Sequence, residues 1–98
     1  MEIVWDEQAW ADLDDIWNYI AQHDIAAATR VFARLRGAVS LLTDHPELGR
    51  TGRAPGTREF VYSDLPYIAV YDINAAAKTI IVLRVIHTSR RYPPKSAG

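Results

Sequence analysis

The side chains that could perform chemistry are few and scattered along the chain. Histidine occurs at His23, His45 and His87, in three separate predicted elements and without the spacing that metal ligands require. Cysteine is absent, which excludes disulfides and thiolate metal sites and suits a reducing compartment. We therefore expect no metal site, no cofactor and no catalytic constellation. His87 ends an apolar run, where a hydrogen-bonded structural histidine is more common than a general base.

Positive charge is concentrated in a segment rich in glycine, proline and arginine at residues 47–56. Arg50, Arg53 and the nearby Arg58 could present this charge at one edge of the fold, and the simpler alternative is an ordinary connector from helix to sheet. Glycine-rich loops also cradle phosphate, but this segment lacks phosphate-loop or dinucleotide spacing and no strand precedes it. We exclude a nucleotide site and keep the three arginines as binding candidates.

Arg84 interrupts a predicted strand face that is otherwise apolar, formed by Ile80, Val82 and Ile86. An unpaired buried guanidinium is costly. Arg84 therefore either pairs with a carboxylate such as Glu59 or faces a groove that a partner fills. The remaining binding candidates are two tyrosines on one strand face, the histidine that closes the other face of the last strand, and two arginines of the tail: Tyr67, Tyr71, His87, Arg90 and Arg91.

Two strand-length apolar runs, residues 66–73 and 78–87, form the centre of the predicted fold, with a turn at Asn74 between them. The second run is nearly continuous and rich in β-branched residues, which is typical of a central strand buried on both faces. Residues 57–62 form a third candidate strand, and residues 63–66 turn the chain back. Three consecutive strands with short connections predict an antiparallel meander.

Two helices precede these strands. Residues 2–5 read as a short strand, after which Asp6 offers a side-chain oxygen to the free N–H groups of a helix start, and Asp24 does the same for a second helix. Apolar residues recur at helical spacing and predict one core-facing stripe in each helix: Trp10, Leu13, Ile16, Trp17 and Ile20, then Ala28, Val31, Phe32, Leu35, Ala38, Val39 and Leu42. Three aspartates lie off the first stripe and should be solvated: Asp12, Asp14 and Asp15. The tryptophans, Trp5 included, are expected in the core rather than on a base-stacking surface.

These elements predict a single α+β domain over residues 1–98, in the order β-α-α-β-β-β. The helical hairpin would pack on one face of a small sheet, with an irregular tail from about residue 89. No apolar segment approaches the roughly 20 residues of a membrane span, and the N-terminus lacks a signal pattern, so we expect a cytoplasmic protein. The net charge of −1 conceals an acidic first half and a basic second half. The basic half either faces an anionic partner or neutralises the acidic half within the domain.

The order of elements and the particular residues resemble the ParE branch of the RelE/ParE toxin superfamily of bacterial toxin–antitoxin systems. The matching segments are Trp10–Leu13, Ile16–Ala21, Pro46–Arg50, Gly56–Glu59, Pro66–Tyr71 and Val82–His87. The resemblance implies a small antiparallel sheet flanked by the helical hairpin, and a ParD-like antitoxin of the ribbon-helix-helix type as partner. Such antitoxins pair a DNA-binding end with a segment that folds onto the toxin. Operator DNA would then be reached only through the antitoxin.

The superfamily is divided into two activities. RelE-like members cleave ribosome-bound mRNA, for which basic residues on the sheet activate a ribose hydroxyl and stabilise charge on the phosphate. At the matching positions this chain has Glu59, Val61, Ile68 and Thr88, none of which carries a positive charge. ParE-like members inhibit DNA gyrase through a protein contact, which requires no catalytic residues. The residues therefore favour a gyrase inhibitor that is neutralised when the C-terminal segment of its antitoxin occupies the groove between hairpin and sheet.

Two alternatives stay open. The first is a RelE-like, ribosome-dependent mRNA interferase with a displaced basic site, to which Arg84, His87, Arg90 and Arg91 could contribute. The second is a non-toxic family member that serves only as antitoxin partner and co-repressor. Growth arrest on expression would separate both toxins from the non-toxic protein.

Overall fold

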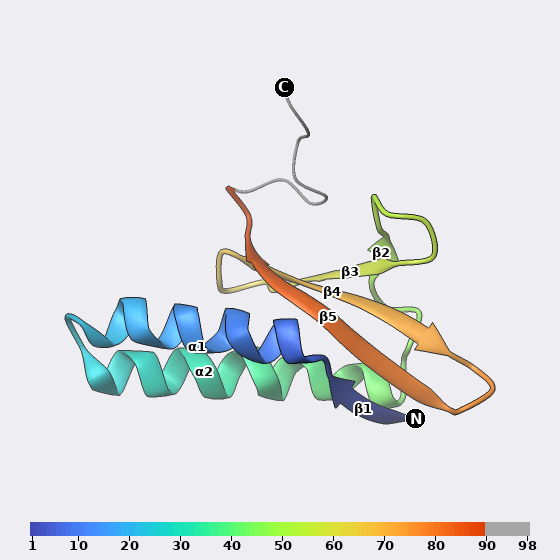
Figure 1. Ribbon diagram of the computed structural model, residues 1–98, viewed down its shortest axis with the longest axis horizontal. Coiled ribbons are helices and arrows are strands. Elements are labelled where there is room, and N and C mark those ends of the chain that lie inside the picture. The colour runs from blue at the N-terminus through green and yellow to red at the C-terminus, as the bar shows by residue number, and fades with distance from the viewer. Residues whose placement is uncertain (90–98) are drawn as a thin grey trace.

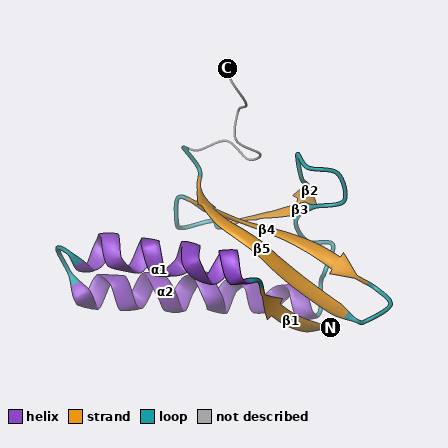
Figure 2. Ribbon diagram, viewed as in Figure 1, coloured by secondary structure: helices purple, strands orange, loops and turns teal. Residues whose placement is uncertain are grey.

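The computed structural model describes residues 1–89, in which two helices form one layer and the strands form another (Figure 1). The elements are β1 (Glu2–Trp5), α1 (Glu7–Ala21), α2 (Ile25–Val39), a 3₁₀ turn η1 (Ser40–Thr43), β2 (Arg50–Thr51), β3 (Arg58–Val61), β4 (Tyr67–Asn74) and β5 (Thr79–His87). The long strands cross over the helical hairpin, and the turn between the two helices extends beyond the sheet (Figure 2).

Both helices begin at the predicted aspartates. The side chain of Asp6 accepts a hydrogen bond from the backbone N–H of Gln8 over 3.1 Å, and that of Asp24 accepts one from Ala27 over 3.0 Å. Each bond satisfies one of the N–H groups that a helix start leaves without an intrahelical acceptor. The short break between α1 and α2 then places the helices against each other as the predicted hairpin.

The sheet has five strands in the order β1-β5-β4-β3-β2. The predicted antiparallel meander is correct for β3, β4 and β5. The sheet extends beyond this meander by one strand on each side. β1 adds a parallel pair beside β5, and β2 pairs antiparallel with β3. The two residues of β2 were expected to belong to a connector because they lie in a segment without hydrophobic periodicity. They form a strand only through their pairing with β3.

A β-bulge interrupts the pairing of β4 with β5. Tyr71 lies opposite Val82 and Val70 lies opposite Arg84, so Leu83 is an extra residue in β5. An extra residue moves the following side chains to the other face of the strand. The predicted face of Ile80, Val82, Arg84 and Ile86 is therefore wrong: Ile80 and Val82 share the core with Val85, while Ile86 joins a second apolar cluster with Ile68 and Val70.

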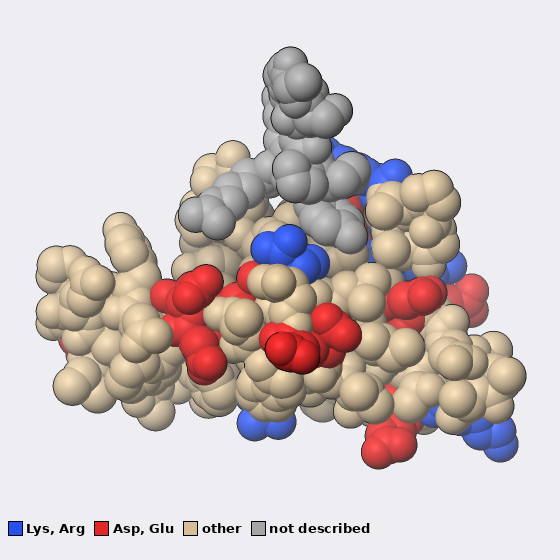
Figure 3. Space-filling view, in the orientation of Figure 1, with Lys and Arg blue, Asp and Glu red and all other residues tan. Residues whose placement is uncertain are grey.

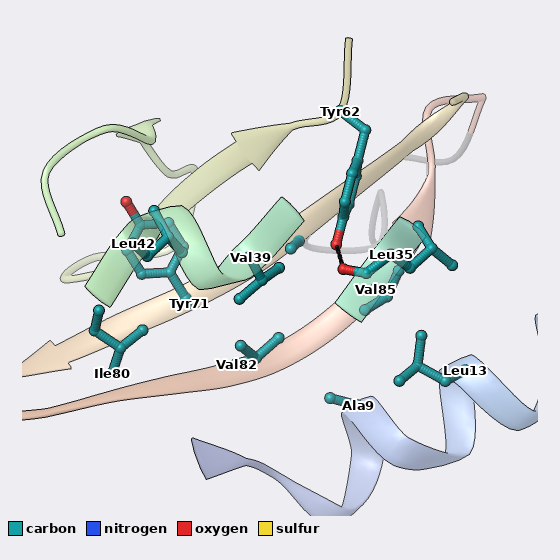
Figure 4. Close-up of a cluster of buried hydrophobic side chains, with 11 residues drawn as sticks. Ala9, Leu13, Leu35, Val39, Leu42, Tyr62, Tyr71, Ile80, Val82 and Val85 are labelled. Atoms are coloured by element: carbon teal, nitrogen blue, oxygen red, sulfur yellow. Dashed lines mark hydrogen bonds between the residues drawn. The ribbon is translucent and has the colours of Figure 1, made fainter. Parts of the chain in front are cut away.

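The core lies between the hairpin and one face of the sheet (Figure 4). Leu13, Leu35, Val39 and Leu42 from the helical layer are fully buried against the side chains of β4 and β5. Tyr62 lies at one end of this core, and its hydroxyl donates a hydrogen bond to the carbonyl oxygen of Leu35 over 2.5 Å. The prediction that the tryptophans are core residues is wrong for Trp10, which is 37% exposed, because the narrower stripe of Ala9 and Leu13 contacts the sheet instead.

Candidate functional site

Arg84 is held by a carboxylate of α1. Its Nε donates to Oδ2 of Asp12 over 2.8 Å and its Nη2 donates to Oδ1 over 3.2 Å. The backbone N–H of Val85 also donates to Oδ2 of Asp12, over 2.9 Å. Of the two alternatives that the sequence left open for Arg84, the structure shows the internal carboxylate partner. That partner is Asp12 rather than Glu59, and the prediction that Asp12 is solvated was wrong.

The position of Asp12 has a simple physical cause. β1 ends at Trp5 and pairs with β5 only as far as Val82. Beyond that point β5 has no strand neighbour on this side within residues 1–89, and the chain continues as α1 along the same edge (Figure 1). Asp12 satisfies a backbone N–H that a strand would otherwise bond, which explains why a polar residue off the apolar stripe is buried.

Glu59 forms a second internal ion pair, on β3. Its carboxylate lies 2.9 Å from the guanidinium Nη2 of Arg50 and accepts a bond from the backbone N–H of Arg53 over 3.4 Å. Arg58 donates to the carbonyl oxygen of Gly49 over 2.8 Å and lies 3.6 Å from the carboxylate of Glu47. Arg50 and Arg58 therefore fasten the loop between η1 and β3 to the sheet. The exposed side chain of Arg53 has no such bond within the described residues.

Tyr71 anchors the same loop from the core. Its hydroxyl accepts a hydrogen bond from the backbone N–H of Gly49 over 2.8 Å and donates one to the carbonyl oxygen of Pro46 over 2.7 Å. Burial raises the pKa of Tyr71 above its ordinary value, and the hydrogen bond from Gly49 lowers it by less. Sequence alone left open whether Tyr71 belongs to the core or to a groove, and the structure places it in the core.

Tyr67 and His87 form an aromatic pair where the sheet ends over the hairpin. Their ring centroids lie 5.3 Å apart in a T-shaped arrangement. Burial raises the pKa of Tyr67, and the nearby Tyr19 of α1 raises it further. Tyr19 is 71% exposed and was not among the predicted site residues. We call Tyr19, Tyr67 and His87 the aromatic end.

His87 has the local bonds of a structural histidine. The backbone N–H of Ser89 donates to its Nδ1 over 3.1 Å, and the hydroxyl of Ser89 lies 2.8 Å from the same nitrogen. A backbone N–H is only a donor, so Nδ1 is an acceptor and the neutral ring carries its proton on Nε2. The other predicted residues at this end of the chain, Arg90 and Arg91, lie outside the described residues.

An open groove of about 410 Å³ lies at the outer edge of β3. It is lined by Leu48, Arg50, Glu59, Phe60, Val61 and Ser63. β2 pairs only with Arg58 and Glu59, which leaves the edge of β3 without a strand neighbour at Phe60 and Val61 in the described structure. The exposed side chains of Leu48 and Val61 make this β3 groove partly apolar. Sequence reasoning missed the groove because it did not predict the pairing of β2 with β3.

Within residues 1–89, no three His, Asp or Glu side chains lie together in a way that could hold a metal ion. No helix in that part of the chain is both long and apolar enough to span a bilayer. The described residues form ion pairs, an aromatic end and an edge groove.

The sequence of this chain matches a known protein family and individual proteins. The family model described as "ParE toxin of type II toxin-antitoxin system, parDE" matches residues 3–92. This chain belongs to the ParE toxin family. It is 41% identical over 91 residues to Y4kP of Sinorhizobium fredii, covering 93% of this chain and 92% of that protein. It is also 36% identical over 89 residues to toxin RelE2 of Caulobacter vibrioides, covering 91% of this chain and 97% of the relative.

A solved structure supports the ParE assignment at the level of the fold. A chain of the chromosomal ParDE toxin–antitoxin system of P. aeruginosa superposes with a TM-score of 0.78 at 26% identity, covering 89% of this ParE-family chain and 95% of that one. The resemblance inferred from the sequence is therefore confirmed, and with it the assignment to type II toxin–antitoxin systems. Toxins of this kind occur in complexes with antitoxins, as the ParDE system illustrates.

Proposed function

We propose that this ParE-family toxin inhibits DNA gyrase through a protein contact in the bacterial cytoplasm and is neutralised by a ParD-like antitoxin. The observation that carries the proposal is the family match over nearly the whole chain, residues 3–92. A toxin that acts by contact requires an accessible surface rather than a set of reacting groups. The aromatic end and the β3 groove are surfaces of this kind.

The positions at which a RelE-like ribonuclease would need cations support this reading. Glu59 is anionic and is bonded to Arg50. Val61 is exposed and apolar, and Ile68 is nearly buried in the second apolar cluster. Cleavage of RNA requires positive charge or a proton donor close to the reacting phosphate, and none of these side chains supplies either.

The aromatic end is the place where we expect the antitoxin segment to bind. Tyr19 comes from the hairpin, whereas Tyr67 and His87 come from the sheet, so an extended or helical segment that crosses this end of the molecule would contact both layers. Exposed tyrosines are common energetic centres of protein interfaces. The basic half of the chain favours a segment with acidic residues, and Arg90 and Arg91 remain predicted contributors to that binding.

The function is tested by a pulse of expression in bacteria that lack the antitoxin, with DNA breakage and mRNA cleavage scored in the same culture. We expect broken DNA, an induced damage response and intact messages. Purified gyrase should lose supercoiling activity on addition of the toxin and regain it when the antitoxin is added. Cut messages with intact DNA would replace the proposal by the mRNA-interferase alternative, and normal growth with neither effect would leave the co-repressor alternative.

The antitoxin surface is tested by two matched truncations. Tyr19→Ala at the aromatic end should weaken antitoxin binding by about thirtyfold, because truncation of an interface tyrosine typically costs about 2 kcal/mol. Leu48→Ala in the β3 groove removes an apolar side chain that is also exposed, and it should leave the affinity almost unchanged. The reverse result, measured by calorimetric titration with the antitoxin, would move the binding site to the β3 groove.

A further inference from the structure

The outer side of the helical hairpin carries an aromatic surface that the proposed function does not use. The guanidinium of Arg36 on α2 lies 4.9 Å from the ring centroid of Trp10 on α1, and 6.0 Å from the rings of both Trp5 and Phe32. The rings of Trp5 and Trp10 lie 5.7 Å apart. Trp10 and Arg36 are exposed, and the guanidinium lies within the distance at which a cation is attracted to the face of an aromatic ring. We call this cluster and the hollow beside it the outer seam.

The hollow continues the seam toward the hairpin turn. It has a volume of about 290 Å³ and is lined by Asp14, Trp17, Asn18, Thr29 and Phe32. The seam therefore contains four aromatic rings, an arginine and a cavity between two helices. Tryptophan and arginine beside a pocket are the composition typical of the energetic centre of an interface.

Gly37 on α2 leaves open space beside the helix backbone. A glycine within a helix costs about 1 kcal/mol relative to alanine, so its presence calls for a reason. A Cβ at Gly37 would meet no atom within 4 Å, so the packing of this domain gives none. Gly37 follows Arg36 directly, and Ala33 lies one turn before it, so small side chains leave the backbone of α2 accessible beside the seam.

The charges of the two helices indicate what the partner is. Every charged residue of α1 is acidic, and every charged residue of α2 is basic. Asp12 and Arg34 form ion pairs within the chain, which leaves Glu7, Asp14 and Asp15 on α1 and Arg30 and Arg36 on α2 to face a partner. The acidic side chains gather over α1 (Figure 3). A twofold axis parallel to the hairpin would place α1 of one copy over α2 of the other, so that each acidic helix faces a basic one.

We propose that the outer seam binds the outer seam of a second copy of this chain and forms an antiparallel four-helix arrangement. The stacked aromatic rings would form its centre, the small residues around Gly37 would allow close approach, and opposite charges would flank both sides. The contact is isologous, because each copy contributes the same residues. It leaves the aromatic end and the β3 groove open, so it is independent of antitoxin binding.

The proposal is tested by sedimentation of the full-length chain over a range of concentrations. We expect a monomer–dimer equilibrium. Trp10→Ala should raise the dimer dissociation constant by about thirtyfold through loss of the central ring. Gly37→Leu should abolish the dimer by steric overlap, while thermal unfolding confirms that the variant is folded. Arg53→Glu reverses an exposed charge on the distant loop and should leave the equilibrium unchanged.

A charge exchange gives the sharpest result. Arg36→Glu and Asp14→Arg should each raise the dissociation constant of the corresponding homodimer on the order of a hundredfold, because like charges then face each other. An equimolar mixture of the two variants should form heterodimers, in which opposite charges face each other again. A wild-type chain that stays monomeric overturns the proposal, as does a dimer that persists in every variant or a mixture that fails to associate.

Discussion

Two buried carboxylates, Asp12 on α1 and Glu59 on β3, each form an ion pair with an arginine, but they connect different parts of the molecule. They are only 7% and 4% exposed, and each is bonded to an arginine. Asp12 joins residues that are 72 positions apart and thereby connects the helical layer to the sheet. Glu59 and Arg50 are nine positions apart and hold a loop to an edge strand.

The two carboxylates differ in the backbone N–H group that each one satisfies. Asp12 accepts a bond from the backbone N–H of Val85 on strand β5, so its loss would leave a buried donor unsatisfied beside the core. The backbone bond of Glu59 comes from Arg53, which lies in a largely exposed loop. We infer that the first pair contributes to global stability and that the second contributes to local order.

Asp12→Ala should have the largest effect. It removes the acceptor of Val85 and the carboxylate of Arg84 together, and we expect a loss of about 3 kcal/mol in the free energy of unfolding. The midpoint of urea denaturation measures this loss, provided that the slope of the transition is unchanged. Asp15→Ala is the matched control, because Asp15 is exposed on the same helix, and it should shift stability by less than about 0.5 kcal/mol. Equal shifts in the two variants would show that the buried pair has no special role.

The comparison also explains which contacts the sequence could predict. The caps Asp6 and Asp24 and the order of elements follow from local patterns, because a helix start and a strand run are defined within a few residues. The partner of Arg84 depends on where β1 ends and α1 crosses β5, and on the bulge at Leu83. Gly49 is a similar case: a Cβ there would lie 2.6 Å from the Tyr71 hydroxyl, a contact that only the fold reveals.

Tyr71→Phe should have the second-largest effect, and it acts on the loop that Glu59 also holds. The variant removes the acceptor of the Gly49 N–H and the donor to the Pro46 carbonyl oxygen. We therefore expect the free energy of unfolding to fall by about 2 kcal/mol. Burial raises the pKa of Tyr71 in the folded state, so the folded protein retains the proton after the unfolded tyrosine, with its pKa of 10.0, has released it. Stability should therefore fall as pH rises above about 10.

The alkaline loss of stability should be smaller in Tyr71→Phe than in the wild type, and it should not vanish, because burial also raises the pKa of Tyr62. Urea denaturation at a series of alkaline pH values measures the free energy of unfolding of the wild type and of Tyr71→Phe. An unchanged slope in Tyr71→Phe would contradict the burial of the Tyr71 hydroxyl.

Glu59→Gln should have a smaller effect that is confined to the loop. The amide retains an acceptor for Arg53 but loses the charge that attracts Arg50, whose side chain is largely exposed. We expect a global loss of about 1 kcal/mol together with faster hydrogen exchange at the backbone N–H of Arg53. Exchange in α1 should be unaffected. If protection in α1 fell to the same extent, the two carboxylates would belong to one cooperative unit, and the contrast between global and local roles would fail.

Glu47→Gln should have the smallest effect, and it shows why burial decides the comparison. Glu47 also lies beside an arginine, 3.6 Å from Arg58, but its side chain is 80% exposed. Water and salt screen such a pair, so stability should change by less than about 0.5 kcal/mol. The carbonyl oxygen of Gly49 would continue to hold Arg58. Urea denaturation at low and high salt measures the difference, and a loss as large as that of Glu59→Gln would mean that proximity to arginine, rather than burial of the carboxylate, sets the strength of these pairs.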